Sequence, residues 1–129
     1  SQLDIGAHSR SVKIAEREPV RLHPDDAAAR GLRPGDIVRI FNERGSCLAG
    51  LVTDDGVRQG VAQLSTGAWY DPDPDDPSFC RHGNPNVLTA DRPSSPLSQG
   101  CTGQLALVQI EAYTEPVPDL TILRPPPTR

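Results

Sequence analysis

The sequence has few of the residues on which several classes of protein depend. Of its 129 residues only three are cysteine and 4% are aromatic, and the formal net charge is −4. Three cysteines without C-x-x-C spacing cannot form the dense, even set of a disulfide scaffold, so we expect reduced thiols. An acidic balance disfavours nucleic acid as a partner. No apolar run approaches the ~20 residues that cross a bilayer, so no membrane span is expected.

Methionine is absent altogether, and position 1 is Ser1. An intact reading frame begins with methionine, so we expect a domain cut from a longer enzyme rather than a complete catalyst. Removal of an initiator methionine before Ser1 is the alternative. The length suits one domain, which can bury roughly two-thirds of its unfolded surface.

Proline, by contrast, is in excess, with 14 residues, eleven of which fall in three groups at 72–77, 85–96 and 116–127. The first two groups indicate a long loop system, which is usually functional or disordered. Because proline neither continues a helix nor donates to a strand ladder, the chain from about Thr114 should be extended or disordered. We therefore expect a domain over residues 1–113 and a Pro-rich tail over 114–129.

The pattern of turns and apolar residues predicts a mainly β protein. The segment from His23 to Gly31 begins with proline and two acids, continues with alanines and ends in glycine, which predicts a short helix. Turns are expected at 34–36, 42–45 and 54–56, with Gly45 adopting φ > 0. Short strands are expected at 12–15, 20–22, 37–41, 47–53, 61–64 and 104–112. Many short strands with one or two short helices indicate a small closed barrel or an α+β barrel.

The usual catalytic signatures are missing. There is no G-x-S-x-G nucleophile elbow, and Ser65-Thr66-Gly67 lacks the carboxylate of an aspartic protease. Neither of the two glycine-rich phosphate motifs occurs, so a phosphate would be held by backbone N–H groups and isolated arginines. Hydrolase activity is therefore not expected.

Two groups of potential metal ligands are better explained without a metal. Cys80, His82 and Cys101 lack the paired short spacings of a zinc site. The acids from Asp71 to Asp76 resemble a calcium loop, but Asp76 and His82 stand where an EF-hand has glycine and glutamate. The loop is interpreted as a solvated, acidic, Pro-rich segment.

Residues 66–104 combine amides, glycines and aromatic residues in an unusual way. The amides Asn84, Asn86, Gln99 and Gln104 can each donate and accept, which matches the edge of a purine or pterin. Nearby glycines allow a close approach to a flat ligand. Asn and Gly as simple turn formers are an equally good explanation, and Trp69 alone is more often a core residue than a ligand platform.

Several ordered blocks, which cover residues 1 to about 113, are specific in combination. They are Ser1-Gln2, Arg17-Glu18-Pro19, residues 23–31, 35–39 and 42–45, Gly67-Ala68-Trp69-Tyr70-Asp71-Pro72, residues 82–91 from His82-Gly83-Asn84-Pro85-Asn86 to Asp91, and 94–100. Together they resemble the C-terminal domain of molybdopterin oxidoreductases, and most of all the biotin sulfoxide, trimethylamine N-oxide and dimethyl sulfoxide reductases. The resemblance implies a double-psi β-barrel that binds molybdopterin guanine dinucleotide, with molybdenum held by other domains of a bacterial parent enzyme. The implied reaction is reduction of an S-oxide or N-oxide.

The resemblance also implies the residues that contact the cofactor and leaves the metal and catalytic residues outside this chain. In order of preference they are Asn84, Asn86, Gln99 and Gln104, then Ser1 and Gln2, then His82 and Trp69. The chain departs from the family at Pro93, where a glycine is usual, and this puts Ser94 and Ser95 in doubt while adding Arg92 as a phosphate partner. A free-standing barrel that acts as an interaction module is the alternative function, and catalysis by the isolated chain is a third. Either the cytoplasm or the periplasm is expected, and the unpaired cysteines favour the cytoplasm.

Overall fold

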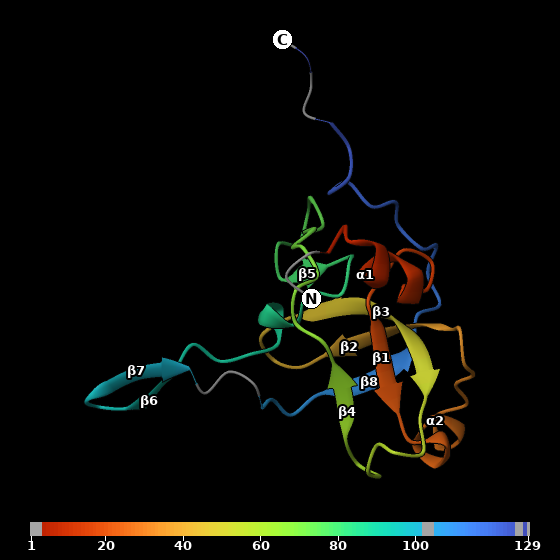
Figure 1. The fold of residues 1–129 in the computed structure, drawn as a ribbon, viewed down its shortest axis with the longest axis horizontal. Helices are drawn as coiled ribbons and strands as arrows, with labels where there is room; N and C mark the ends of the chain where they lie inside the picture. Colours follow the sequence, from red (N-terminus) through yellow and green to blue (C-terminus); the bar gives the residue numbers. More distant parts are fainter. Residues whose placement is uncertain (1–3, 102–104, 126–127, 129) are drawn as a thin grey trace.

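The computed structural model describes residues 4–101, 105–125 and 128. Within them the chain forms a mainly β body with two short α-helices and one projecting hairpin (Figure 1). The elements are α1 (Ala7–Val12), β1 (Pro19–Leu22), α2 (Pro24–Ala29), β2 (Ile37–Phe41), β3 (Ser46–Thr53), β4 (Ala62–Leu64), β5 (Phe79–Cys80), the 3-10 helix η1 (Pro85–Val87), β6 (Pro93–Ser95), β7 (Ser98–Cys101) and β8 (Gln109–Ala112).

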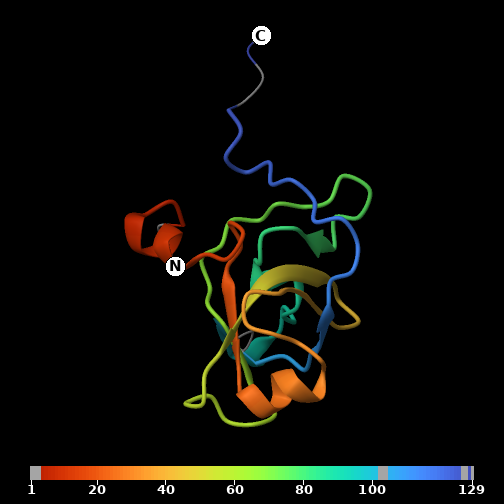
Figure 2. The ribbon, with the colours of Figure 1, turned by 90° about the vertical axis from the view of Figure 1, so that its right-hand side faces the viewer.

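Six strands form one curled sheet in the order β4-β1-β3-β2-β8, with β5 paired to β3. The β2–β3 hairpin is antiparallel, whereas β1 and β5 each run parallel to β3. The sheet wraps around its own apolar face, and α2 covers one end of it (Figure 2). The buried core is built from the following side chains: Val20, Leu22, Ala27, Leu32, Val38, Ile40, Cys47, Ala49, Leu51, Cys80 and Leu88.

The expected helix is confirmed, together with the signals that predicted it. Pro24 stands in its first turn, the His23 side chain accepts a hydrogen bond from the Asp25 backbone N–H at 3.1 Å, and Gly31 takes φ +67° where the helix ends. The strands expected at 20–22, 37–41, 47–53 and 61–64 are confirmed with small shifts at their ends.

Three local expectations were wrong. Residues 12–15 do not form a strand, because α1 runs to Val12 and Ile14 only bridges Arg17 across a turn. The last strand covers 109–112 rather than 104–112, since its partner β2 ends at Phe41 and leaves the earlier residues without a ladder. Gly45 does not take a positive φ; a Cβ there would lie 2.5 Å from the Ser78 carbonyl oxygen, so close backbone approach requires the glycine.

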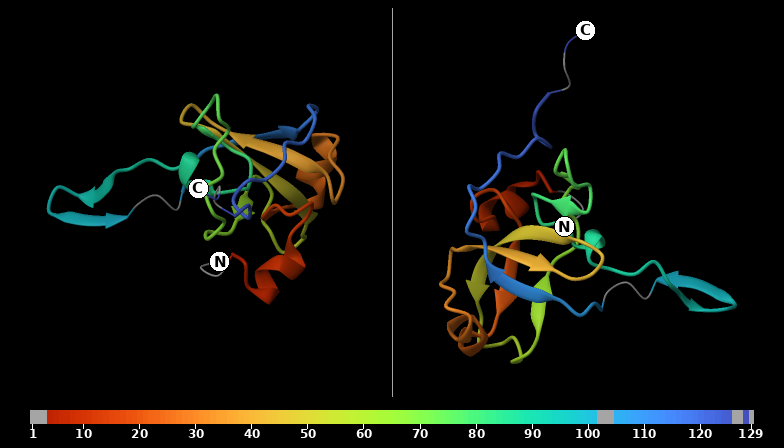
Figure 3. Two further views of the ribbon diagram at one scale, coloured as in Figure 1. Left: turned by 90° about the horizontal axis from the view of Figure 1, so that it is seen from above. Right: turned by 180° about the vertical axis from the view of Figure 1, so that it is seen from behind.

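The β6–β7 arm, residues 93–101, projects away from the body of the protein (Figure 3). Its register shifts between Pro93 and Ser95, so the proline that departs from the family pattern lies at an irregular point of the hairpin. Leu97 at the turn is 98% exposed. A two-stranded hairpin that pairs with no other strand is only marginally stable in water, so the arm contributes little to the stability of the body.

Candidate cofactor-binding site

The two strongest family blocks, residues 67–72 and 82–91, lie against each other. The His82 ring Nδ1 is 3.0 Å from the Trp69 carbonyl oxygen, and the Asn84 side-chain amide donates to the Ala68 carbonyl oxygen at 2.8 Å. The Arg81 backbone N–H donates to the Asp71 carbonyl oxygen at 2.8 Å. Three residues between positions 81 and 84 therefore hold the backbone of the first block at positions 68, 69 and 71.

Asn84 and Asn86 differ in what their side chains do. The Asn84 side-chain oxygen Oδ1 accepts from the Asn86 backbone N–H at 2.9 Å and caps η1, so both ends of this side-chain amide are used inside the chain. The Asn86 side chain is exposed and makes no hydrogen bond within the described residues. Of the two, Asn86 has the amide that is free to recognise a ligand.

Gln99 and Arg92 are not brought together with the asparagines. Gln99 is exposed on β7 within the projecting arm, and Arg92 is exposed at the residue before the arm begins. In contrast, η1 lies where the chain leaves the body toward the arm (Figure 1). Trp69 is 42% exposed and is therefore not a core residue. Ser1, Gln2 and Gln104 lie outside the described residues.

His82 is buried, at 1% exposure, in a cluster of charged groups that sequence reasoning missed. Asp4 accepts from Lys13 Nζ at 2.6 Å and from the Trp69 backbone N–H at 3.2 Å, and its Oδ2 is 3.5 Å from His82 Nδ1. Burial raises the pKa of Asp4, but the Lys13 hydrogen bond, the Trp69 N–H and the nearby His82 and Lys13 charges outweigh burial, so the net pKa is lowered. Asp4, Lys13 and His82 are far apart in sequence and form no local motif, so the sequence alone does not reveal this cluster.

A second buried cluster ties the C-terminal segment to the body. Asp71 accepts hydrogen bonds from the Thr121 backbone N–H at 2.8 Å, from the Thr121 hydroxyl, and from Arg81 Nη2 at 3.0 Å. Arg17 donates from Nε to the Arg81 carbonyl oxygen at 2.9 Å and from Nη2 to the Pro118 carbonyl oxygen. The part of the tail over residues 114–125 thus has no helix or strand and runs across the body through Pro118 and Thr121.

Among the described residues, no group of three or more His, Cys, Asp or Glu side chains is arranged so that it could hold a metal ion. Cys47 and Cys80 are buried free thiols that lie opposite each other in the β3–β5 register. Burial raises the pKa of the Cys47 thiol, and the neighbouring Cys80 raises it further. Such a thiol is an inert packing group.

The described helices include none that is both long and apolar enough to cross a membrane. In overall shape, acetylene hydratase from Pelobacter acetylenicus matches 74% of this chain with a TM-score of 0.59 at 19% sequence identity, and the match covers 14% of that protein. At this identity the likeness concerns the fold alone.

Sequence comparison is more specific. The chain is 49% identical over 115 residues to a trimethylamine-N-oxide reductase of Salmonella typhi, 44% identical over 123 residues to a dimethyl sulfoxide/trimethylamine N-oxide reductase of Rhodobacter capsulatus, and 47% identical over 114 residues to a biotin sulfoxide reductase of Cereibacter sphaeroides. These matches cover 88–94% of this chain but only 14–15% of each relative. The model of the molydopterin dinucleotide binding domain matches residues 1–106. The chain therefore belongs to the molydopterin dinucleotide-binding domain family.

Proposed function

We propose that this chain binds molybdopterin guanine dinucleotide as one domain of a molybdenum oxidoreductase that reduces an S-oxide or an N-oxide. The observation that carries the proposal is the family match over residues 1–106, together with relatives that are named as oxide reductases. The relatives are several times longer than this chain, so the active centre, the substrate pocket and the protein ligand to molybdenum belong to the rest of the parent enzyme. Cytoplasm and periplasm both suit such an enzyme, and the buried free thiols favour the cytoplasm.

We also propose that the sheet is a double-psi β-barrel and that the cofactor domain spans 1–113, followed by the tail 114–129. The parallel β1–β3 pair within a largely antiparallel sheet supports this topology. So does the curl of the sheet, which brings its two end strands to opposite sides of one opening.

The donor groups on this chain fit the cofactor. The exposed amides of Asn86 and Gln99 can each donate to and accept from a pterin or guanine edge, and Arg92 supplies a positive charge for a phosphate. Asn84 and His82 act as positioning residues, because they hold the backbone at Ala68 and Trp69. When bound, the cofactor supplies the molybdenum and dithiolene chemistry of oxygen-atom transfer.

The test compares Asn86→Ala and Gln99→Ala in the parent enzyme with Gln63→Ala, a control at an exposed amide on β4. Each lost hydrogen bond is worth about 1 kcal/mol, so cofactor retention should fall several-fold per substitution. Retention is measured as pterin and GMP released per polypeptide after acid treatment and dialysis. Full retention in both variants, as in the control, would remove these two residues from the site.

A further inference from the structure

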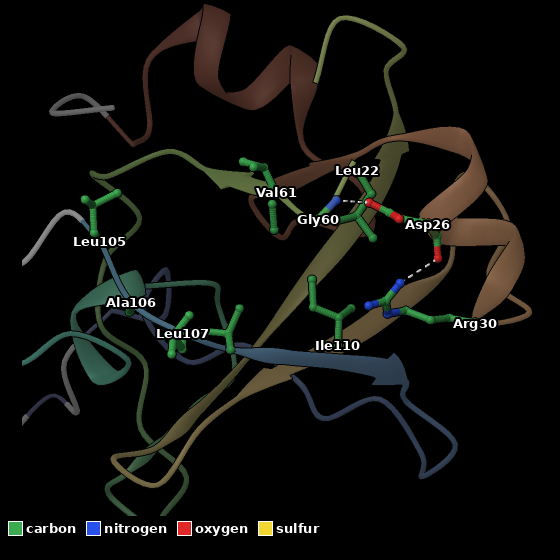
Figure 4. Close-up of a pocket in the computed structure, with 11 residues that line it drawn as sticks. Leu22, Asp26, Arg30, Gly60, Val61, Leu105, Ala106, Leu107 and Ile110 are labelled. Carbon is green, nitrogen blue, oxygen red and sulfur yellow. Dashed lines mark hydrogen bonds between the residues drawn. The ribbon is translucent and has the colours of Figure 1, made fainter. Parts of the chain in front are cut away.

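The two ends of the six-stranded sheet lie on opposite sides of an open pocket of about 420 Å³, called here the β4/β8 opening. Its apolar lining comes from Leu22, Val61, Ala62, Leu107, Val108 and Ile110. Figure 4 shows Leu22, Val61, Leu107 and Ile110 around the space between the two strands, with α2 at one end and Leu105 toward the other. None of the residues that line this opening is among the proposed cofactor-binding residues.

The rim of the opening is strongly apolar and exposed. Val61 is 47% exposed, Leu105 91% and Leu107 92%, and all three line the same pocket. Single exposed apolar side chains are ordinary, but several around one concavity mark an interaction site. Leaving this apolar surface exposed to water is therefore unfavourable, and burying it against a partner would be favourable.

The strands beside the opening also have unused backbone groups. In the described part of the chain β4 pairs with β1 alone and β8 pairs with β2 alone, so each has a free edge. At the α2 end the polar groups are already engaged: Asp26 accepts from the Gly60 N–H at 2.7 Å, and Arg30 donates to the Asp26 carbonyl oxygen at 2.9 Å. An apolar extended segment meets both needs, because its backbone pairs with a free edge and its alternate side chains fill the pocket.

We propose that the β4/β8 opening holds an extended apolar segment from outside residues 1–129 of the same parent polypeptide. The inference rests on the proposed function, under which this chain is one domain of a longer enzyme. The relatives supply the argument for this occupant, since the matched region is only 13–16% of their length and the remainder must contact this domain somewhere. A segment with large apolar residues at every second position and no charge among them fits the lining.

The experiment uses the full-length parent enzyme with Leu107 replaced by the photo-crosslinking amino acid p-benzoylphenylalanine. Illumination should join residue 107 to one peptide from outside residues 1–129 of the same polypeptide. The peptide is identified by mass spectrometry, and the crosslinked protein should keep its monomer mass. The same replacement at Val117, which is 46% exposed and lies outside the opening, should not capture that peptide. A crosslink between two copies, or no crosslink at position 107, overturns the proposal.

A charge placed in the opening provides a second measurement. Val61→Asp should increase hydrogen exchange of the captured segment several-fold in the full-length enzyme, whereas Val117→Asp, at almost the same exposure, should not. Unchanged exchange in both variants counts against docking at this site. Pterin and GMP content of the same preparations separates the two proposals: cofactor present without the crosslink defeats only the docking, and cofactor absent from the unmodified enzyme defeats the proposed function.

Discussion

Two asparagines only two positions apart differ in what their side chains contact. Asn84 bonds to the Ala68 carbonyl oxygen and caps η1, whereas the amide of Asn86 is exposed. We expect Asn84→Ala to lower the free energy of unfolding by about 1–2 kcal/mol, since a cap and a loop contact are lost. Asn86→Ala should change it by less than about 0.5 kcal/mol. Urea unfolding of both variants measures this, and equal losses would contradict this difference.

Protonation of Asp71 should make the free energy of unfolding fall at acidic pH. Burial raises its pKa, but hydrogen bonds from Thr121 and the Arg81 charge outweigh burial, so its pKa in the folded state lies below the ordinary value. A lowered folded pKa means that its stabilisation is complete above the unfolded pKa and is lost as the pH falls through the folded pKa. Stability should therefore decline below about pH 4, with Asp4 contributing in the same direction.

The variant Asp71→Asn tests this at a single position. Removing one partner of a buried ion pair leaves Arg81 uncompensated, so the free energy of unfolding at pH 7 should fall by about 3 kcal/mol. The acid-dependent decline should also become shallower, because one carboxylate that binds a proton on unfolding is gone. Urea unfolding from pH 7 to pH 3 measures both effects, and a decline as steep as in the parent would contradict the role of Asp71.

Strand β3 is tightly packed at Gly50. A Cβ added to Gly50 would lie 2.3 Å from the Ile14 Cβ, because the turn at residues 14–17 packs directly onto the strand. Gly50→Ala should therefore lower stability by about 1–3 kcal/mol through overpacking. The double variant with Ile14→Gly should recover part of the loss, and a double-mutant cycle in thermal unfolding measures the coupling. Additive losses would show that the crowding has another source.

The helices and strands that were predicted correctly are those whose ends are set by local sequence signals. α2 begins with Pro24 and ends at Ala29, just before Gly31, and the β2–β3 hairpin follows from its apolar runs and the turn between them. β8 was predicted too long because its length depends on where β2 ends. The Asp4 cluster was missed for the same kind of reason, since Asp4, Lys13 and His82 meet only after folding. The amides were found by their chemistry, but only the fold distinguishes the capping Asn84 from the exposed Asn86.

For the whole molecule, the C-terminal segment acts as part of the body. Thr121 gives Asp71 two hydrogen bonds and Pro118 accepts one from Arg17, so the segment contacts groups that are otherwise buried. Deleting residues 119–129 should lower the free energy of unfolding by about 1–3 kcal/mol, since the buried carboxylate loses partners. Thr121→Val, which keeps the backbone N–H, should cost less. Thermal unfolding of both forms measures this. An unchanged midpoint of thermal unfolding after the deletion would show that the segment does not stabilise the body.

The pairing of β2 with β8 has a consequence for how the protein is made. Arg39 and Glu111, which face each other in this ladder, are 72 residues apart in the chain. A ribosome synthesises β2 long before β8, so β2 waits with one edge unpaired, and Asp71 waits likewise for Thr121. Pairings between such distant segments form slowly, and unpaired edges are open to the wrong partners in the meantime. The domain cannot complete its sheet until β8 has left the ribosome, so the six-stranded sheet forms only after residues 109–112 have been synthesised.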